Sequence, residues 1–143
     1  MITRESDYAI RILACMAWAS ERYISSTELA ERTDVPYRFL RKIARRLIQA
    51  GLVASIRGRT GGMKLKRPAR DISLLEVIDA TDPRGARLNV CIGGGRPGVP
   101  CRGRRGCRAQ RVLTKLQNRL RTGMASVRLD RLADPGHCPA AKT

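Results

Sequence analysis

The sequence has 143 residues, of which 43% are apolar and only 3% aromatic, and a formal net charge of +17. This length fits one domain with a modest aliphatic core, and so large a positive charge favours a polyanionic partner. With one histidine and no nucleophile–base constellation, an enzyme acting on a small-molecule substrate is not expected. An odd cysteine count of five argues against a secreted disulfide scaffold and indicates a cytoplasmic protein with reduced thiols. The apolar run 10–19 is too short to span a membrane, so no membrane partner is expected.

The first predicted helix covers residues 7–20, which have apolar residues at helical spacing. Cys15 falls in the apolar stripe and is interpreted as a small core residue. Asp7 falls in the first turn, where a carboxylate suits the helix dipole. The pattern Ser25-x-x-Glu28 is a capping box that opens a short helix over 27–33.

The third predicted helix begins at Pro36 and ends at Gly51, a residue that is favoured at the C-terminal end of a helix. Its apolar residues Leu40, Ile43 and Leu47 face inward, and its cations face outward. Between Val35 and Arg70 there is no Asp or Glu, which suggests a surface that meets phosphate. Two helices joined by a tight turn predict a helix-turn-helix, whose second helix enters the major groove of DNA. The predicted DNA contacts on this helix are Tyr37, Arg38, Arg41, Lys42 and Arg45.

A β-hairpin is predicted directly after this helix, from strands at 52–57 and 63–66 joined by a glycine-rich turn. A hairpin in this position is the wing of a winged helix. Its cations Arg57, Arg59 and Lys64 are expected at the tip, within reach of DNA. A further short helix over 73–81 opens with the capping box Ser73-x-x-Glu76.

Three cysteines, Cys91, Cys101 and Cys107, lie in a stretch rich in glycine and proline. Such composition excludes helix and strand interiors and predicts a long loop. Three thiols on a pliable loop can converge on one metal ion or cluster. The alternatives are a zinc site, and a disordered basic loop whose cysteines are incidental.

The last predicted helix, 108–127, carries a narrow apolar stripe: Val112, Leu116, Leu120, Met124 and Val127. Such a stripe suits packing against a second copy, and the alternative is packing against its own domain. The tail from Asp134 is expected to be disordered. His137 and Cys138 in it are a conceivable but disfavoured ligand pair.

The segment from Gly51 to Leu65, GLVASIRGRTGGMKL, closely resembles the wing signature of the BadM/Rrf2 family of bacterial winged-helix transcriptional regulators. The resemblance spans nearly the whole chain, and the three cysteines are similar to those of the iron–sulfur subgroup. It implies a dimer in which Cys91, Cys101 and Cys107 hold a cluster, and the state of this cluster sets the affinity for DNA. In the nitric-oxide-sensing branch, an aspartate of the partner subunit is the fourth ligand, and Asp7 occupies that place here.

Two departures from the family pattern bear on the cluster. The gap between Cys91 and Cys101 is longer than is usual in the family. Gln110 stands where the iron–sulfur-assembly branch has a histidine ligand, so the nitric-oxide-sensing arrangement is favoured.

The sequence therefore predicts a mainly α fold with a small β wing. Its parts are a winged helix-turn-helix (1–82), a Gly/Cys-rich cluster-binding loop (83–107), a dimerisation helix (108–130) and a disordered tail (131–143). The protein is expected to be a homodimeric transcriptional repressor. It would bind a double-stranded DNA operator and sense nitric oxide, redox state or iron through an iron–sulfur cluster. A 4Fe–4S cluster is favoured and a 2Fe–2S cluster is the other form considered. The alternatives are a zinc- or thiol-based regulator on the same scaffold and a basic RNA-binding protein, against which the scarcity of aromatics counts.

Overall fold

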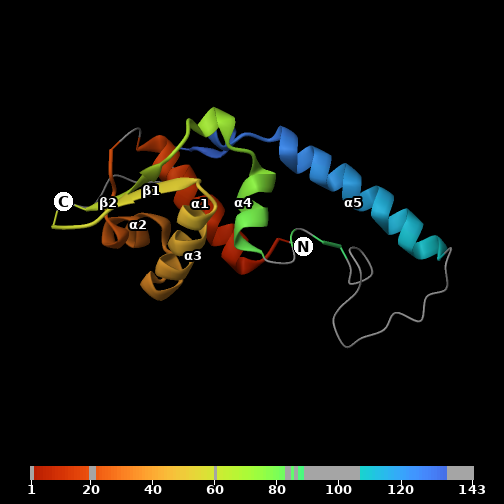
Figure 1. Ribbon diagram of the computed structural model, residues 1–143, viewed down its shortest axis with the longest axis horizontal. Coiled ribbons are helices and arrows are strands. Elements are labelled where there is room, and N and C mark those ends of the chain that lie inside the picture. The colour runs from red at the N-terminus through yellow and green to blue at the C-terminus, as the bar shows by residue number, and fades with distance from the viewer. Residues whose placement is uncertain are drawn as a thin grey trace.

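The computed structural model describes residues 2–19, 22–59, 61–82, 85, 87–88 and 107–134. Most of the predicted cluster-binding loop, 89–106, and the end of the tail lie outside these residues. The described elements, in chain order, are α1 (Arg4–Trp18), α2 (Ser26–Thr33), α3 (Tyr37–Gln49), β1 (Val53–Ile56), β2 (Gly62–Leu65), η1 (Ala69–Asp71), α4 (Leu74–Thr81), α5 (Arg108–Ser126) and η2 (Leu129–Leu132) (Figure 1). This is the predicted mainly α fold with a two-stranded wing.

The aliphatic core lies where α1 meets α2, α3, α4 and the wing. Its fully buried members include Ile12, Leu13, Leu29, Leu40, Ile43 and Leu47. Cys15 belongs to this core, as predicted, and is 1% exposed. The expectation that all thiols are reduced is wrong for Cys15, which is disulfide-bonded.

Helix α1 begins at Arg4, one turn before the apolar periodicity begins. Thr3 is its N-cap, and the Thr3 hydroxyl accepts a hydrogen bond from the Ser6 amide at 3.2 Å. A polar cap of this kind satisfies one of the free amides of the first turn and extends the helix beyond its apolar stripe. The extra turn adds Glu5 and Ser6 to α1, and both contact other helices.

The start and end of α3 follow the predicted turn chemistry. Asp34 closes α2 in the left-handed conformation, and Pro36 is the N-cap of α3. At the other end Gly51 has φ +72, a conformation that favours glycine. The Leu52 amide then donates to the Leu47 carbonyl at 3.0 Å, which closes the helix in a Schellman-type cap.

The wing is an antiparallel pair in which Val53 faces Leu65 and Ile56 faces Gly62. Met63 of β2 also exchanges two backbone hydrogen bonds with Ile24, at 2.8 and 2.9 Å. A Cβ atom on Gly62 would lie 2.7 Å from the Ile24 carbonyl oxygen, and one on Gly61 would lie 2.6 Å from that of Ile56. The two consecutive glycines of the wing motif are therefore required by close approach of the backbone.

Helix α4 begins with the predicted capping box. The Ser73 hydroxyl accepts from the Glu76 amide at 3.3 Å, and the Glu76 carboxylate accepts from the Ser73 amide at 2.8 Å. Arg67 donates to the same carboxylate at 2.7 Å. The hydrogen bond from Arg67 is the main reason that the pKa of Glu76 falls from 4.5 to about 2, and the bonds from Ser73 add to it.

Glu76→Gln should reduce the loss of stability in acid. Because the folded-state pKa is depressed, this carboxylate stabilises the fold above pH 4.5, and the stabilisation is lost as the pH falls toward 2. Glutamine keeps the capping box but not the charge. Urea unfolding between pH 7 and pH 2 should show a shallower decline for the variant, and equal declines would contradict this role.

Helix α5 is tied to the domain by polar contacts and extends away from it (Figure 1). Arg121 binds Asp79 of α4 through two hydrogen bonds of 3.2 and 2.9 Å. Gln117 is 3% exposed, and its side-chain oxygen accepts from the Leu88 amide at 2.8 Å. The chain then returns through η2, whose Leu129 is fully buried in the core. None of the helices within the described ranges has the length and hydropathy needed to cross a bilayer.

The predicted domain boundaries stay a prediction. The bounds 1–82 and 108–130 follow the ends of α4 and α5 closely. Residues 131 and 132, assigned to the tail, belong to η2.

Candidate DNA interface and candidate metal site

The outer face of α3 presents the five predicted DNA-binding residues of that helix, all of them exposed: Tyr37, Arg38, Arg41, Lys42 and Arg45. The four cations among them line an open hollow of about 690 Å³ together with Arg46 and Gln49. Within the part of the chain that the structure describes, the residues that line this hollow include no acid. The face suits a polyanion, because the charged residues that line it are all positive.

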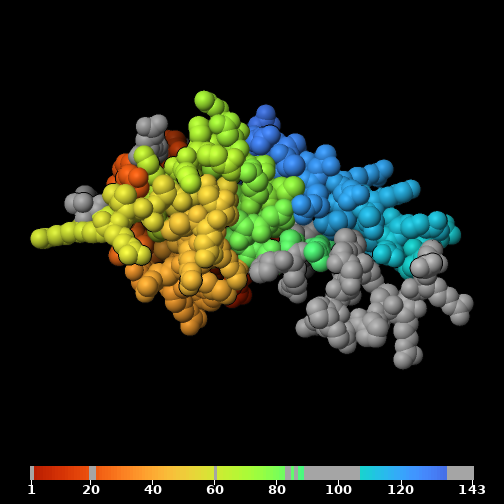
Figure 2. All heavy atoms as spheres, viewed as in Figure 1, coloured from red at the N-terminus to blue at the C-terminus, as the bar shows by residue number. Residues whose placement is uncertain are grey.

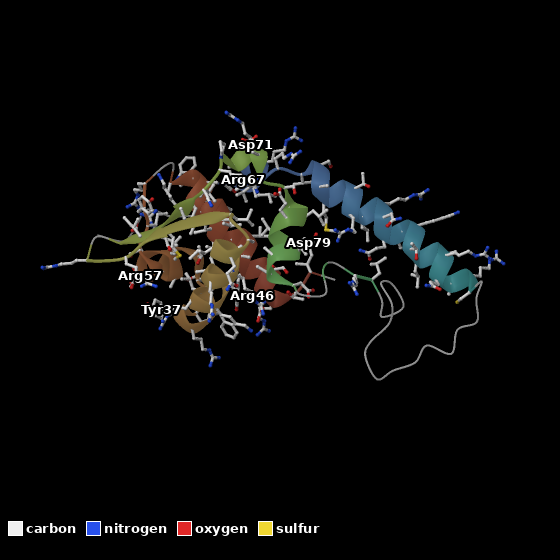
Figure 3. All side chains as sticks on the ribbon, viewed as in Figure 1. Tyr37, Arg46, Arg57, Arg67, Asp71 and Asp79 are labelled. Atoms are coloured by element: carbon white, nitrogen blue, oxygen red, sulfur yellow. The ribbon has the colours of Figure 1, made fainter. Side chains whose placement is uncertain are left out.

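A second hollow, of about 590 Å³, separates α3 from the wing. Arg41 and Arg45 line one side, and Arg57 with the exposed Ile56 lines the other. Figure 2 shows the atoms of α3 and the wing at the end of the molecule opposite α5. Figure 3 places Tyr37 and Arg57 at that same end. Cations of α3 and of the wing therefore lie on the two sides of one hollow.

The wing cations differ in their surroundings. Arg57 and Arg59 are exposed. Lys64 lies in the middle of β2, opposite Ala54, and not at the tip. Its amino group is 4.9 Å from the centre of the Tyr23 ring, a contact that holds the cation against the domain.

Arg38, near the start of α3, stacks on an aromatic pair. Its guanidinium lies 4.9 Å from the centre of the Phe39 ring, and that ring is 5.9 Å from the ring of Tyr8 in α1. The contact restrains the guanidinium against the Phe39 ring, and Arg38 nevertheless remains exposed.

Glu5 of α1 binds two cations of α3, which sequence reasoning did not find. Lys42 donates to one carboxylate oxygen at 2.6 Å, and Arg46 donates to the other. The hydrogen bond from Lys42 is the main cause that lowers the pKa of Glu5. Arg46 also donates to the carbonyl of Thr81, the last residue of α4. Arg46 is thus turned toward the domain, although its spacing predicts an outward side chain.

Of the four predicted metal ligands, Cys107 and Asp7 lie in the described part of the chain, and Cys91 and Cys101 lie outside it. Cys107 is a free, partly exposed thiol directly before α5, so its donor chemistry fits an iron or zinc site. Asp7 forms an ion pair with Arg11 at 3.1 Å. Among the described residues no three His, Cys, Asp or Glu side chains form a group able to hold a metal ion.

Helix α1, which carries Asp7, and the start of α5, which follows Cys107, lie apart in the structure. Figure 1 shows the start of α5, which follows Cys107, at the end of the molecule far from α1. Asp7 and Cys107 of one chain therefore do not form a common site in this arrangement.

A basic helix following a tight turn, with a β-hairpin beside it, defines a winged helix-turn-helix DNA-binding protein. The comparison of the sequence with family models agrees. Residues 2–135 match the model described as "Rrf2: Iron-dependent Transcriptional regulator". The chain belongs to the Rrf2 family of transcriptional regulators, so it is a DNA-binding regulator and not an enzyme.

Individual relatives support this assignment. An rrf2-like regulator of the helix-turn-helix type from Rhodobacter capsulatus is 33% identical over 99% of this chain and 97% of its own. The regulator IscR from Cereibacter sphaeroides is 31% identical over 87% of this chain and 76% of its own. Among solved structures, the B. subtilis global cysteine regulator CymR has a TM-score of 0.72 at 21% identity, with 93% of this chain and 95% of the other covered. The structural likeness concerns the fold alone.

Arg41→Ala should weaken binding to a specific DNA duplex by about 1–3 kcal/mol if Arg41 reads a base. Arg41, like Arg45, lines both hollows. The measurement is a titration of a duplex selected from a random pool and of a random duplex. Arg70→Ala, which removes an equally exposed arginine from η1, is the control. Equal losses on both duplexes would make Arg41 a phosphate contact instead.

Proposed function

We propose that the chain is a homodimeric repressor whose affinity for its DNA operator is set by an iron–sulfur cluster bound to Cys91, Cys101 and Cys107. The observation that carries the proposal is the free thiol of Cys107 at the junction between the cysteine-rich segment and α5. The description of the family as iron-dependent supports iron as the metal.

The proposed DNA contacts are Tyr37, Arg38, Arg41 and Arg45 in the major groove or on its phosphates, and Arg57 and Arg59 from the wing. Their exposure and the absence of acids from the α3 hollow support this assignment. Lys42 and Lys64 are weaker candidates, because both cations already have partners within the domain.

The exposed side of α5 supports the proposed dimer. Val112, Leu116 and Leu120 are 58%, 46% and 44% exposed, although they follow one another at intervals of one helical turn. Gln117 and Arg121 hold a different side of α5 against the domain. The apolar stripe is therefore free to pack against a second copy of α5.

The anchoring of the cysteine-rich segment suggests how the cluster would act. Gln117 holds Leu88, three residues before Cys91, and Cys107 leads directly into α5. Both ends of the segment are thus attached to the proposed dimer helix. Loss of the cluster would free the segment between these anchors and alter the arrangement of the two DNA-binding domains, as a ligand change that biases a two-state element.

Asp7 is proposed as a fourth ligand only across the dimer. Within one chain, α1 is separated from the start of α5. We therefore propose that a cluster held by one subunit would take Asp7 of the partner subunit as its fourth ligand. A weakly bound oxygen ligand would leave one iron open to nitric oxide, to oxygen or to loss under iron scarcity.

A thiol- or zinc-based regulator on the same scaffold is the second candidate. The disulfide of Cys15 favours thiol chemistry. Zinc and thiol sites are colourless, so absorption separates both from an iron–sulfur cluster.

Anaerobic purification followed by iron and acid-labile sulfide assays tests the proposal. About four of each per monomer would support a 4Fe–4S cluster, and about two of each a 2Fe–2S cluster. A colourless protein that cannot be reconstituted with iron and sulfide would refute the cluster and leave the second candidate.

A further inference from the structure

The cations of α3 form two groups with different partners. Arg41 and Arg45 have no ion pair with any residue in the described part of the chain. Lys42 and Arg46, one helical turn apart, end on the two oxygens of a single carboxylate, that of Glu5. The helix that is expected to meet DNA thus carries two cations that are already paired with one shared carboxylate.

These two paired cations are held from two sides. Glu5 lies in the turn of α1 that the Thr3 cap creates, and its side chain is 26% exposed. Arg46 also donates to the carbonyl of Thr81 at the end of α4, where the helix dipole favours a cation. Among the described residues Lys42 is paired with this carboxylate alone, and its side chain is 54% exposed. Arg46 is therefore fixed firmly, and Lys42 is the cation that loss of the carboxylate would free most readily.

The pair lines the same hollow as the free arginines of α3. A free cation at that surface binds a DNA phosphate and releases a counterion, which adds about 0.9 to the slope of log K against log salt concentration. A cation neutralised by a carboxylate gains less from a phosphate, because one ion pair must be weakened to form the other. Glu5 thus holds two cations away from phosphates in the part of binding that does not depend on sequence, although its single negative charge neutralises only one of them.

We propose that Glu5 is a specificity-determining residue, which withholds Lys42 and Arg46 from DNA phosphates and so limits binding to random DNA. The inference rests on α3 being the DNA-binding helix. The affinity for random DNA depends on charge alone, and the protein can shift along the duplex to the position at which its cations contact the most phosphates. Operator complexes are fixed by base contacts, so they gain less from two freed cations. A protein with a net charge of +17 needs such a limit, because random sites in a genome outnumber operators greatly.

The test compares Glu5→Gln with Glu31→Gln in the full-length protein purified anaerobically. Glu31 is an exposed acid of α2 with no ion pair among the described residues, so its variant controls for the change in net charge. Affinities are measured over a range of salt for a random duplex and for a duplex selected from a random pool. Iron content and thermal unfolding are recorded for each protein.

Glu5→Gln should steepen the salt dependence on random DNA by about 0.9–1.8. At 0.1 M salt this relation corresponds to about an eightfold rise in affinity for each added contact. The ratio of selected to random affinity should fall, and Glu31→Gln should change both quantities less. Equal slopes for the two variants would overturn the inference. Wild-type protein that binds neither duplex would instead refute the DNA-binding function itself.

Lys42→Gln supplies an independent test that does not require Glu5→Gln to fold. Alone, it should leave the salt dependence on random DNA nearly unchanged, because the charge it removes is already paired with Glu5. In the Glu5→Gln background it should lower the slope by about 0.9. A loss of about 0.9 from Lys42→Gln alone would show that Lys42 contacts phosphate in the native protein, which contradicts the role of Glu5.

Discussion

Cys107→Ser is expected to reduce the iron bound per monomer to background while leaving the fold intact. A thiolate is a strong ligand for cluster iron and a serine hydroxyl is a poor one. Cys107 is a partly exposed free thiol before the first turn of α5, so its loss removes a ligand without opening a cavity in the core. The measurement is iron and sulfide content after anaerobic reconstitution, with circular dichroism as the check on folding.

Cys138→Ser is the matched control for Cys107→Ser. It removes a cysteine from the end of the chain, where the sequence disfavours a ligand role. The control should retain full iron. Iron retained by Cys107→Ser would remove Cys107 from the ligand set, and iron lost from both variants would point to a general effect of thiol loss.

Leu116→Glu should convert the protein to a monomer and reduce its affinity for a two-half-site operator by about 10²–10⁴-fold. Leu116 is the middle residue of the exposed stripe on α5 and is 46% exposed in the single chain. A carboxylate at the centre of an apolar contact between two helices is left without a partner and opposes association. Light scattering measures the mass, and a titration with the selected duplex measures the affinity.

Asn118→Glu introduces the same charge on the opposite side of α5. Residue 118 is exposed and lies about 200° around the helix from residue 116. This variant should remain a dimer and keep its affinity for the operator. A dimeric Leu116→Glu would contradict the role assigned to the stripe, and dissociation of both variants would mean that charge alone drives the effect.

The elements of the DNA-binding domain could be predicted because local signals define them. Leu40, Ile43 and Leu47 occur at helical spacing, and Gly51 marks the end of α3. The two capping patterns mark the starts of α2 and α4, and the glycines mark the wing. Each signal lies within a few residues of the structure it specifies, and all of them agree.

The contacts that combine these elements could not be predicted in the same way. Glu5 and Arg46 are 41 residues apart, and no spacing rule joins an acid in the first turn of one helix to a cation two helices later. Leu129 follows a basic helix and gives no local sign that it returns to the core. The position of Lys64 depends on the register of the two strands. A change of two residues in the length of the hairpin would shift that register.

The cysteine-rich segment marks a different limit. From the sequence, Gly and Pro predict neither helix nor strand for residues 93–106, and they specify no particular conformation. Three cysteines in such a segment indicate a shared metal site, but their spacing does not choose between an iron–sulfur cluster and zinc. That choice depends on the fourth ligand and on the metal supplied, so it belongs to the chemistry of the isolated protein.

The most direct test of the central claim is to measure anaerobically the affinity of one preparation for the selected duplex before and after chelation of its iron. If the cluster sets the affinity with which α3 and the wing bind DNA, the affinities before and after chelation should differ by about 5- to 150-fold. This is the usual range of coupling between two binding sites. Restoring iron and sulfide should restore the first value. Equal affinities with and without iron would contradict the claim, and would leave a DNA-binding regulator whose metal, if it binds one, is not its switch.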